Sequence, residues 1–324
     1  MAKKLKLNGI DEEVPILNED GKIDSSQYES GVSQEEFDSL SNRVSILEAS
    51  PEDIDMANHY QAIIDSTKKC NGSSSTGDFF TINAGDNGFD KDSTNWNFLN
   101  LLDFSEVSST YFMFYNCTSL TKIVMKRLGV HTAGYECAYM FYGCTNLEDV
   151  VIEDGTPITL ANMFYGCTNL KNVTLGVDTS RVSSVNSMFR DCVNLETLPM
   201  FDTSNVTDWL GMIWGCTKIT KFPAYNTSSA TSFFSTFYGC TSLINIELLD
   251  VSKNPSLSAT FSNCTSLESV KFASSNVPTT YITTFTNVPS ECIFYVPSAL
   301  FEEWSTAQYW ADVNVVAYDE SEVL

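Results

Sequence analysis

Seven cysteines recur at nearly constant intervals, and cysteines in such numbers could ligate a metal, form disulfides or act as nucleophiles. They are Cys117, Cys144, Cys167, Cys192, Cys216, Cys240 and Cys264, separated by 27, 23, 25, 24, 24 and 24 residues. The sequence has no CxxC pair among them and no histidine beside them, which argues against a zinc site. Equivalent side chains on stacked turns point the same way rather than at one another, so we expect free, buried thiols.

Other residues that could perform catalysis are sparse. His59 and His131 are the only histidines, they lie in different regions, and no phosphate-binding loop or GxSxG motif is present. A stretch at 16–27 resembles a calcium-binding loop but lacks carboxylates at its first and last positions. We therefore predict no enzyme, no metal and no cofactor. Scattered carboxylates could still pair in the fold, so a glycan-cleaving enzyme stays an alternative.

The cysteines mark a repeat of about 24 residues, a period typical of a solenoid. Five units have an apolar pair before the cysteine, such as Met140-Phe141, and two have Thr-Phe there; every unit has Leu or Ile three residues after the cysteine. Apolar residues stand again six and eight residues past the cysteine, as Val150 and Ile152 do, which predicts one short, half-buried strand per unit. Runs such as DTS at 178–180 predict a turn or cap that opens the next unit.

The repeats resemble a known family. The strings MFYNCTSLTKI, MFYGCTNLEDV, MFYGCTNLKNV and TFYGCTSLINI look like the BspA-type leucine-rich repeats of bacterial surface proteins, over about residues 99–290. The resemblance implies an elongated, curved solenoid used for adhesion or surface display. The segment CIFYVPSALFEEWSTAQYWADVNVVAY is similar to the strand, helix and strand that close many such arrays. We predict an α/β solenoid with short parallel strands at 77–290 and a C-terminal cap at 291–324.

The region before the repeats has a different pattern. Apolar residues at heptad positions predict a short coiled coil at 32–50; they are Phe37, Leu40, Val44 and Leu47. An amphipathic helix that packs on the same chain is the alternative. Residues 51–76 are expected to form a second helix, within 52–69, and then a flexible linker. Residues 1–31 are polar and short, so we expect them to gain order by docking on a larger partner.

A docking peptide, a brief coiled coil and a distal domain resemble the layout of head or tail fibre proteins of phages that infect gut Bacteroidetes. This resemblance implies a virion fibre in which 1–31 bind a capsid or tail protein. The shortness of the anchor favours the head. We expect a homotrimer made in the host cytoplasm, placed on the virion surface, that binds a host-surface glycan or protein. The alternative is an adhesin on the bacterial cell surface.

Charge excludes some partners. The chain has 18 Lys and Arg against 41 Asp and Glu, a formal net charge of -23, so nucleic acids and anionic membranes are repelled on average. The sequence contains neither a secretory signal pattern nor an apolar stretch long enough to span a bilayer, and we expect no membrane insertion.

The outward strand positions are the candidates for ligand binding. Nine residues after the cysteines the sequence has Glu153, Phe201, Tyr225 and Leu249 in four of the units. Stacking would place Phe201, Tyr225 and Leu249 side by side, which predicts an exposed patch that binds a sugar or a protein. The alternative is that the strand has ended by this position and these side chains pack in the core or on a neighbouring subunit.

Overall fold

The computed structural model describes residues 53, 57, 58, 62, 99, 102, 104, 107, 109–125, 128–130 and 137–319. The four described positions from 53 to 62 have helical backbone, inside the stretch predicted to be a helix. The heptad residues Phe37, Leu40, Val44 and Leu47 and the segment 1–31 lie outside the described residues, so the coiled coil stays a prediction. In the described part of the chain, no helix combines the length and apolarity needed to cross a bilayer.

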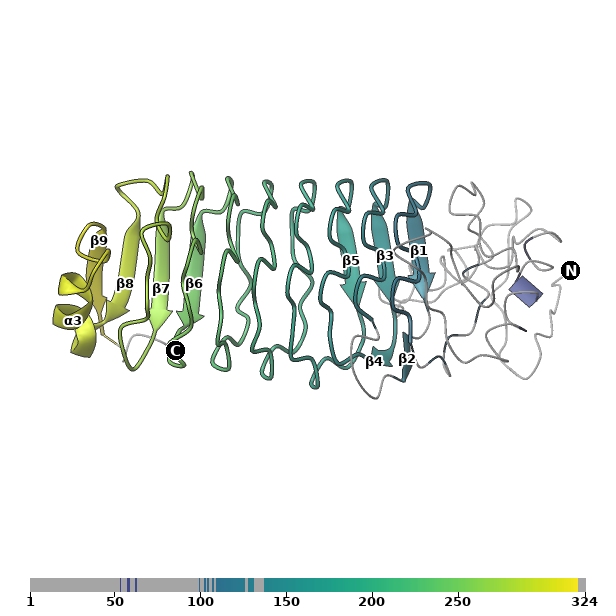
Figure 1. Ribbon diagram of the computed structural model, residues 1–324, viewed down its shortest axis with the longest axis horizontal. Coiled ribbons are helices and arrows are strands. Elements are labelled where there is room, and N and C mark those ends of the chain that lie inside the picture. Colours follow the sequence, from purple (N-terminus) through teal and green to yellow (C-terminus); the bar gives the residue numbers. More distant parts are fainter. Residues whose placement is uncertain are drawn as a thin grey trace, which may run out of the picture.

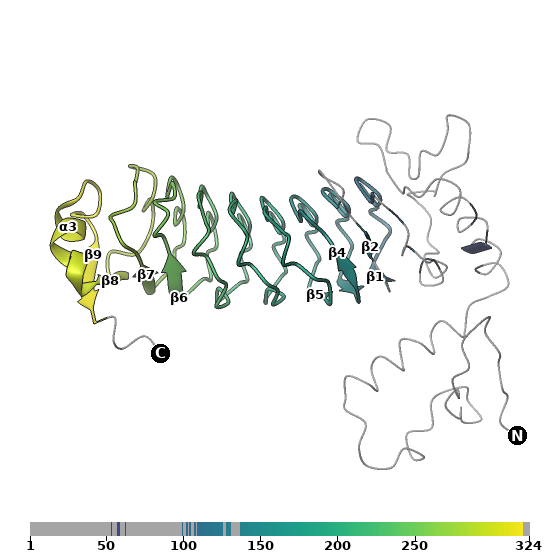
Figure 2. The same ribbon diagram turned by 90° about the horizontal axis from the view of Figure 1, so that it is seen from below.

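The chain winds into an elongated solenoid whose consecutive repeats lie side by side (Figure 1, Figure 2). We call each turn a rung and name it by its cysteine. One parallel sheet contains β1 (Lys122–Met125), β3 (Asp149–Ile152) and β5 (Asn172–Leu175). A second contains β6 (Asn245–Asp250), β7 (Ser269–Ala273), β8 (Ile293–Pro297) and β9 (Asn314–Tyr318). β2 (Leu128–Val130) pairs with β4 (Gly155–Thr156). The predicted parallel stack is confirmed.

The strand prediction is wrong in the Cys192 and Cys216 rungs, which lie between the two sheets. Residues 198–200 and 222–224 form no regular strand, although Lys221 makes an isolated bridge with Asn245. Pro199 and Pro223 occupy the middle of these segments. Proline has no N–H to donate and a fixed φ, so it removes a hydrogen bond from a central ladder. The rungs stay stacked here through other contacts.

The rungs share one core in which equivalent side chains form columns. Three residues before the cysteines, Phe114, Phe141 and Phe164 stack in parallel, with centroids 5.1 and 5.4 Å apart. Ile213 interrupts this column, which resumes between Phe237 and Phe261 at 5.8 Å. Within each run of the column a ring packs on the ring of a neighbouring rung, so an isolated rung could not bury it.

The cysteine column is buried and ties each rung to the one before it. Six of the thiols donate to a backbone carbonyl of the preceding rung over 2.9 to 3.1 Å; the acceptors are Phe114, Phe141, Phe164, Phe189, Ile213 and Phe237. Burial raises the pKa of Cys192 and Cys240, and that of Cys264 to about 12, so these thiols stay protonated donors. They are free thiols, as predicted.

Left-handed residues shape the backbone around each thiol. They stand five and one residues before the cysteine, as Tyr139 (φ 58°) and Gly143 (φ 73°) do. The second position is always Asn, Asp or Gly, the types that adopt positive φ most easily; the residues are Asn116, Gly143, Gly166, Asp191, Gly215, Gly239 and Asn263. This geometry points alternate N–H groups at the next rung, so Gly143 donates to the Tyr165 carbonyl at 2.8 Å.

The predicted Asp-initiated turns are present between rungs. Asp178 and Asp202 accept the backbone N–H groups of Ser180 and Ser204 through Oδ1, each at 2.9 Å. The hydrogen bonds from these serines lower the pKa of both carboxyls, so the aspartates are ionised acceptors at neutral pH. The hydroxyl of Thr179 then donates to the carbonyl of Asp202 in the next rung at 2.9 Å. These turns therefore close one rung and connect it to its neighbour.

The C-terminal segment has the predicted order of strand, helix and strand. After β8 come the short 3-10 helix η3 (Ser298–Leu300), α3 (Phe301–Thr306) and then β9. Trp304 and Trp310 are both 0% exposed and lie against Phe272, with centroids 5.1 and 5.5 Å away. The two indoles are therefore packed into the core at this end of the described chain.

The left-handed position before each cysteine gives a matched test at Gly239, where φ is +72° and a Cβ would make only ordinary contacts. Gly239→Asn should be well tolerated because Asn263 has the same conformation in the next rung. Gly239→Val should lower the free energy of unfolding by about 2 kcal/mol, because a β-branched residue is strained at positive φ. Urea denaturation of both variants measures the difference. Equal losses would contradict a conformational requirement here.

Candidate functional site

The four predicted ligand residues do not form one exposed patch. Leu249 is 0% exposed and Tyr225 is 5% exposed, so both belong to the core, whereas Phe201 is partly exposed and Glu153 is exposed. The pairing of β6 with β7 shifts register between Ile246 and Leu249, and this bulge turns Leu249 inward. The packing alternative therefore describes Tyr225 and Leu249, which are not available to a ligand.

Tyr225 is held in the core by specific contacts. Its hydroxyl donates to the carbonyl of Pro199 at 2.5 Å, and burial raises the pKa of the phenol well above its usual value. Its ring lies 5.1 Å from Phe201 and 5.3 Å from Phe222. With the strand ended by proline, the chain is free to turn this side chain inward, and the ring fills the space between two rungs that lack a sheet.

A different column of side chains is partly exposed along six successive rungs. It stands two residues before each cysteine, and we call it the aromatic row: Tyr115, Tyr142, Tyr165, Arg190, Trp214 and Tyr238. Neighbouring rings lie 5.0 Å apart between Tyr115 and Tyr142, and 4.7 Å apart between Tyr142 and Tyr165. Beyond Arg190, the rings of Trp214 and Tyr238 are 4.6 Å apart. The row is therefore continuous along the solenoid.

The backbone fixes each member of the aromatic row. The carbonyl of Tyr142 accepts the N–H of Asn116 at 2.7 Å, and that of Tyr165 accepts the N–H of Gly143 at 2.8 Å. The carbonyls of Arg190 and Trp214 accept equivalent bonds from the rungs before them, at 2.8 and 2.7 Å. Because these bonds repeat in every rung, the row residues keep one rung spacing and are preorganised for a ligand.

Stacking decides which parts of the rings a ligand can reach. The Tyr115 and Tyr142 planes are 15° apart, so each ring covers one face of the other. The ring edges and the hydroxyls remain accessible to a ligand. Burial and, to a smaller extent, the neighbouring Tyr165 raise the pKa of Tyr142, so its phenol stays protonated. The Tyr142 hydroxyl makes no hydrogen bond to another described residue. The row therefore offers hydroxyls and ring edges rather than open ring faces.

The N-terminal end of the row is broader. Phe112 and Tyr139, three residues before Tyr115 and Tyr142, have ring centroids 4.8 Å apart. Tyr139 also lies 5.8 Å from Tyr142, and Tyr111 contacts Phe112 at 4.2 Å. The two columns together form an aromatic surface over the first described rungs.

A polar groove of about 590 Å³ adjoins this surface, since Tyr139 lines it too. Its other walls come from three following rungs and are mostly polar; they include Asn162, Arg181, Ser184, Asn186 and Asp208. Asp208 Oδ2 accepts hydrogen bonds from the Ser184 hydroxyl at 3.1 Å and the Asn186 amide at 3.3 Å. Among the described residues that line the groove, Asp208 is the single carboxylate. The groove can form hydrogen bonds, but it lacks the carboxylate pair of a glycosidase.

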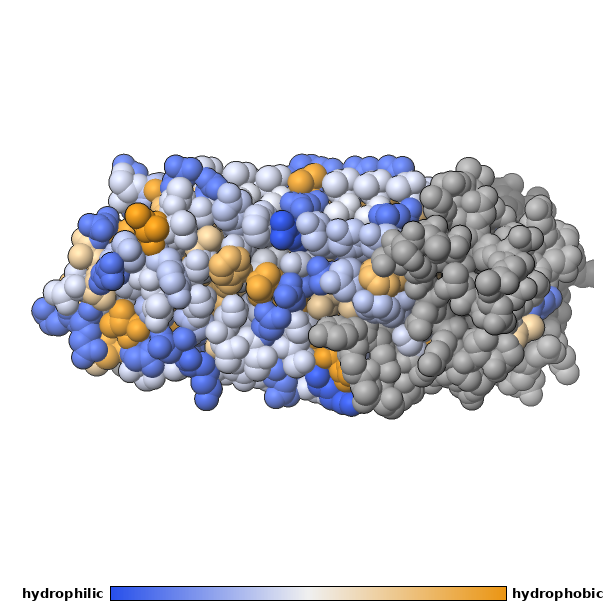
Figure 3. Space-filling model, in the orientation of Figure 1, coloured by the Kyte–Doolittle hydropathy of each residue, from blue (hydrophilic) through white to orange (hydrophobic). Residues whose placement is uncertain are grey.

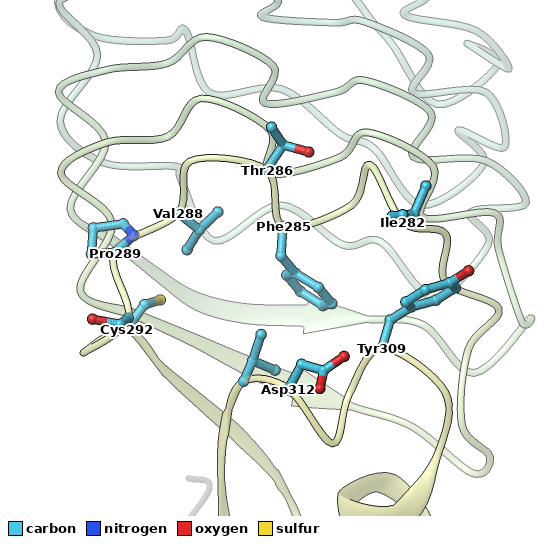
Figure 4. Close-up of a pocket in the computed structure, with 10 residues that line it drawn as sticks. Ile282, Phe285, Thr286, Val288, Pro289, Cys292, Tyr309 and Asp312 are labelled. Carbon is cyan, nitrogen blue, oxygen red and sulfur yellow. The ribbon is translucent and has the colours of Figure 1, made fainter.

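A second cavity, of about 370 Å³, lies at the C-terminal end (Figure 4). It separates the last repeat, with Phe285 and Val288, from the loop that carries Tyr309 and Asp312. Between 281–288 and 307–313, both fully described, the structure has no backbone hydrogen bond, although Thr280 Oγ1 donates to the Gln308 carbonyl at 3.0 Å. The cavity thus marks where the ladder between rungs ends.

The face of the molecule in Figure 3 carries small, separate hydrophobic patches on a largely hydrophilic surface. Exposed large apolar side chains in the described residues are Met200, Phe234, Tyr281 and Ile282. Isolated apolar residues of this kind are ordinary on protein surfaces. The aromatic row and the groove, which combine rings with hydrogen-bonding groups, are therefore the better candidate site.

Residues 57–154 and 158–275 match the family described as "Mycoplasma protein of unknown function, DUF285". A search of the curated proteins found no match. Among solved structures, a leucine-rich cell surface protein from Faecalibacterium prausnitzii A2-165 is similar, with 17% identity, a TM-score of 0.31, and coverage of 64% of this chain and 76% of that one. A leucine-rich repeat protein from Bacteroides ovatus ATCC 8483 has 16% identity, a TM-score of 0.25, and coverage of 64% and 86%.

The burial of Tyr225 predicts a separation of stability from binding. Tyr225→Ala should lower the free energy of unfolding by about 3 kcal/mol or more, because it leaves a cavity and removes a buried hydrogen bond. Glu153→Ala, at an exposed position, should change it by less than about 0.5 kcal/mol. Urea denaturation measures both. A stable Tyr225→Ala protein would contradict the core assignment.

Proposed function

We propose that this chain, which belongs to the family described as "Mycoplasma protein of unknown function, DUF285", is a non-enzymatic adhesion protein that binds a ligand along the aromatic row and the adjoining groove. One observation carries the proposal: partly exposed rings, an arginine and a groove with polar walls lie along consecutive rungs whose backbones are hydrogen-bonded in one register. Repeat proteins commonly use such extended surfaces for binding.

A glycan suits this surface better than a flat protein partner does. The groove is concave, is lined from four rungs, and presents amide, hydroxyl and carboxylate groups beside Tyr139. Sugars offer hydroxyls that can exchange hydrogen bonds with such groups, and ligand sites usually combine apolar walls with a few fixed polar groups. Since the site runs along the rungs, we expect an extended chain of several sugars rather than a single one.

Binding should depend on the hydroxyl of Tyr142 as well as its ring. We expect Tyr142→Phe to weaken glycan binding about fivefold, the loss of one hydrogen bond, and Tyr142→Ala to weaken it further. Tyr281→Phe is the matched control, because Tyr281 is 44% exposed but lies outside the row. A glycan array identifies a ligand and calorimetry measures the affinities.

The results separate the alternatives. A ligand bound equally by wild type and both Tyr142 variants would place the binding surface elsewhere. A protein ligand from the host surface, with no glycan bound on the array, would favour the protein alternative. Products released from a glycan would support the enzyme alternative, which a carboxylate substitution such as Asp208→Asn would then have to abolish.

For the display of this surface we propose the fibre layout expected from the sequence: 1–31 as a virion anchor, 32–50 as a trimeric coiled coil, and the solenoid outermost. A phage head fibre is favoured over a tail fibre by the short anchor. An adhesin on a bacterial cell surface is the alternative. Residues 1–52 lie outside the described part of the chain, so this proposal rests on their sequence.

Light scattering tests the layout. The full chain should be a trimer, and a variant that begins at Pro51 should be a monomer because it lacks the heptads. That start keeps Ala57, which is 7% exposed and belongs to the core. Full-length Leu40→Glu/Leu47→Glu is the control that changes only the seam, and it should also be a monomer. Monomers in every case would contradict the coiled coil and favour the cell-surface adhesin.

A further inference from the structure

The aromatic row contains one cation, and it is clamped between rings. The Cζ atom of Arg190 lies 3.8 Å from the ring centroid of Trp214 and 5.0 Å from that of Tyr165. Arg190 therefore replaces an aromatic ring in the stack with a planar guanidinium. Stacking between two rings holds the plane of this group and removes much of the rotational freedom that a surface arginine has.

The hydrogen-bonding capacity of Arg190 is almost unused. A guanidinium has five N–H donors, yet Nε of Arg190 is buried without a partner, and neither Nη donates to a described residue. The side chain is 27% exposed, and its Nη atoms are not among the buried polar atoms that lack a partner, so they reach the surface. Free donors on a fixed plane are the geometry of a receptor for a planar anion.

The neighbouring carboxylate forms only a loose ion pair with this group, through Nε. Asp191 Oδ2 lies 3.7 Å from Arg190 Nε, too far for a hydrogen bond. Asp191 instead extends over the next rung, where its Oδ1 lies 2.6 Å from the place that a Cβ on Gly215 would take. The glycine at 215 leaves room for this carboxylate beside the backbone. The two Nη groups are consequently left to an external partner.

We propose that Arg190 recognises a carboxylate of the ligand, so that the proposed glycan is an acidic one that contains uronic or sialic acid. This inference rests on the proposed function and names its substrate class. The planar fork of a guanidinium matches the two oxygens of a carboxylate, and such charged hydrogen bonds are among the stronger ones. The phenol of Tyr165 and the indole of Trp214 flank the pair and limit access of water to it. The neutral phenols of Tyr115, Tyr142 and Tyr238 would contact the hydroxyls of neighbouring sugars.

The test compares each glycan with its own carboxyl-reduced form. The probes are oligosaccharides of galacturonic, glucuronic and mannuronic acid and sialylated oligosaccharides, each paired with a reduced, neutral counterpart. We expect wild type to prefer at least one acidic form over its counterpart by about tenfold or more. Arg190→Gln should abolish the preference, because it should weaken binding of the acidic form by about tenfold more than binding of the neutral form. Arg190→Lys should keep only part of it, because lysine retains the charge but not the fork.

Arg181→Gln is the matched control, because Arg181 also carries a positive charge in the proposed site but lines the groove instead of the row. It should keep the acidic preference. A purely structural Arg190 would instead show a lower thermal midpoint in Arg190→Gln with the acidic preference intact, and that result would overturn the inference. Transfer of the preference from carboxylated to sulfated probes would overturn the choice of carboxylate.

The two proposals fail in different ways. If wild type binds neutral glycans, depends on Tyr142 and shows no acidic preference, the inference about Arg190 is wrong and the proposed function stands. If wild type binds no glycan of either form, the proposed function is wrong and this inference is wrong with it.

Discussion

Each rung of this solenoid satisfies its buried polar groups through the rung beside it. The thiol of Cys167 donates to the carbonyl of Phe141 at 3.0 Å, and the N–H of Phe141 donates to the carbonyl of Met163 at 2.8 Å. Both bonds cross between neighbouring rungs, and both are buried. A rung alone would leave a donor and an acceptor without partners in an apolar core, at a cost of about 1 to 3 kcal/mol for each group. The fold therefore depends on this crossing network more than on the strands, and it persists in the Cys192 and Cys216 rungs where the strands are lost.

The same network converts a position in the repeat into a line on the surface. Since successive rungs are held in one register, the residues two before each cysteine must lie in a row, whatever their types. Tyr, Arg and Trp follow one another there without disturbing the backbone, because the carbonyls rather than the side chains hold the register. A single substitution can thus change the side chain that the row presents at one rung, as Arg190 does among the aromatic residues. The surface is a consequence of the stacking, and its specificity lies in which side chains occupy the column.

The sequence was sufficient for the features that recur in most units. The period, the apolar columns, the free thiols, the Asp turns and the parallel strands all follow from residues that recur in nearly every unit. What it did not predict are local departures and one unrecognised column. The apolar alternation predicts strands at 198–200 and 222–224, but Pro199 and Pro223 in their middle lack the N–H groups that a ladder needs. The burial of Leu249 could not be predicted, because it depends on a β-bulge whose position is decided by packing. The Asn, Asp or Gly before each cysteine was a visible sign of positive φ. The row was visible too, as the Tyr of MFYNC and MFYGC, the Arg of MFRDC and the Trp of MIWGC.

The charge of the chain sets a condition on any acidic ligand. With a formal net charge of -23, the protein repels anions at long range, so electrostatic attraction cannot guide such a ligand to the row. At physiological salt, however, charges separated by more than about 8 Å are largely screened, while a contact between partly buried groups is screened much less. A guanidinium held between Tyr165 and Trp214 acts within that shorter range. Selection then occurs on contact: anions that match the fork gain a hydrogen-bonded pair, and others meet only the weak repulsion of the surface. An acidic protein can recognise an acidic glycan on this basis, provided that the cation in contact with the ligand is fixed in position, as Arg190 is.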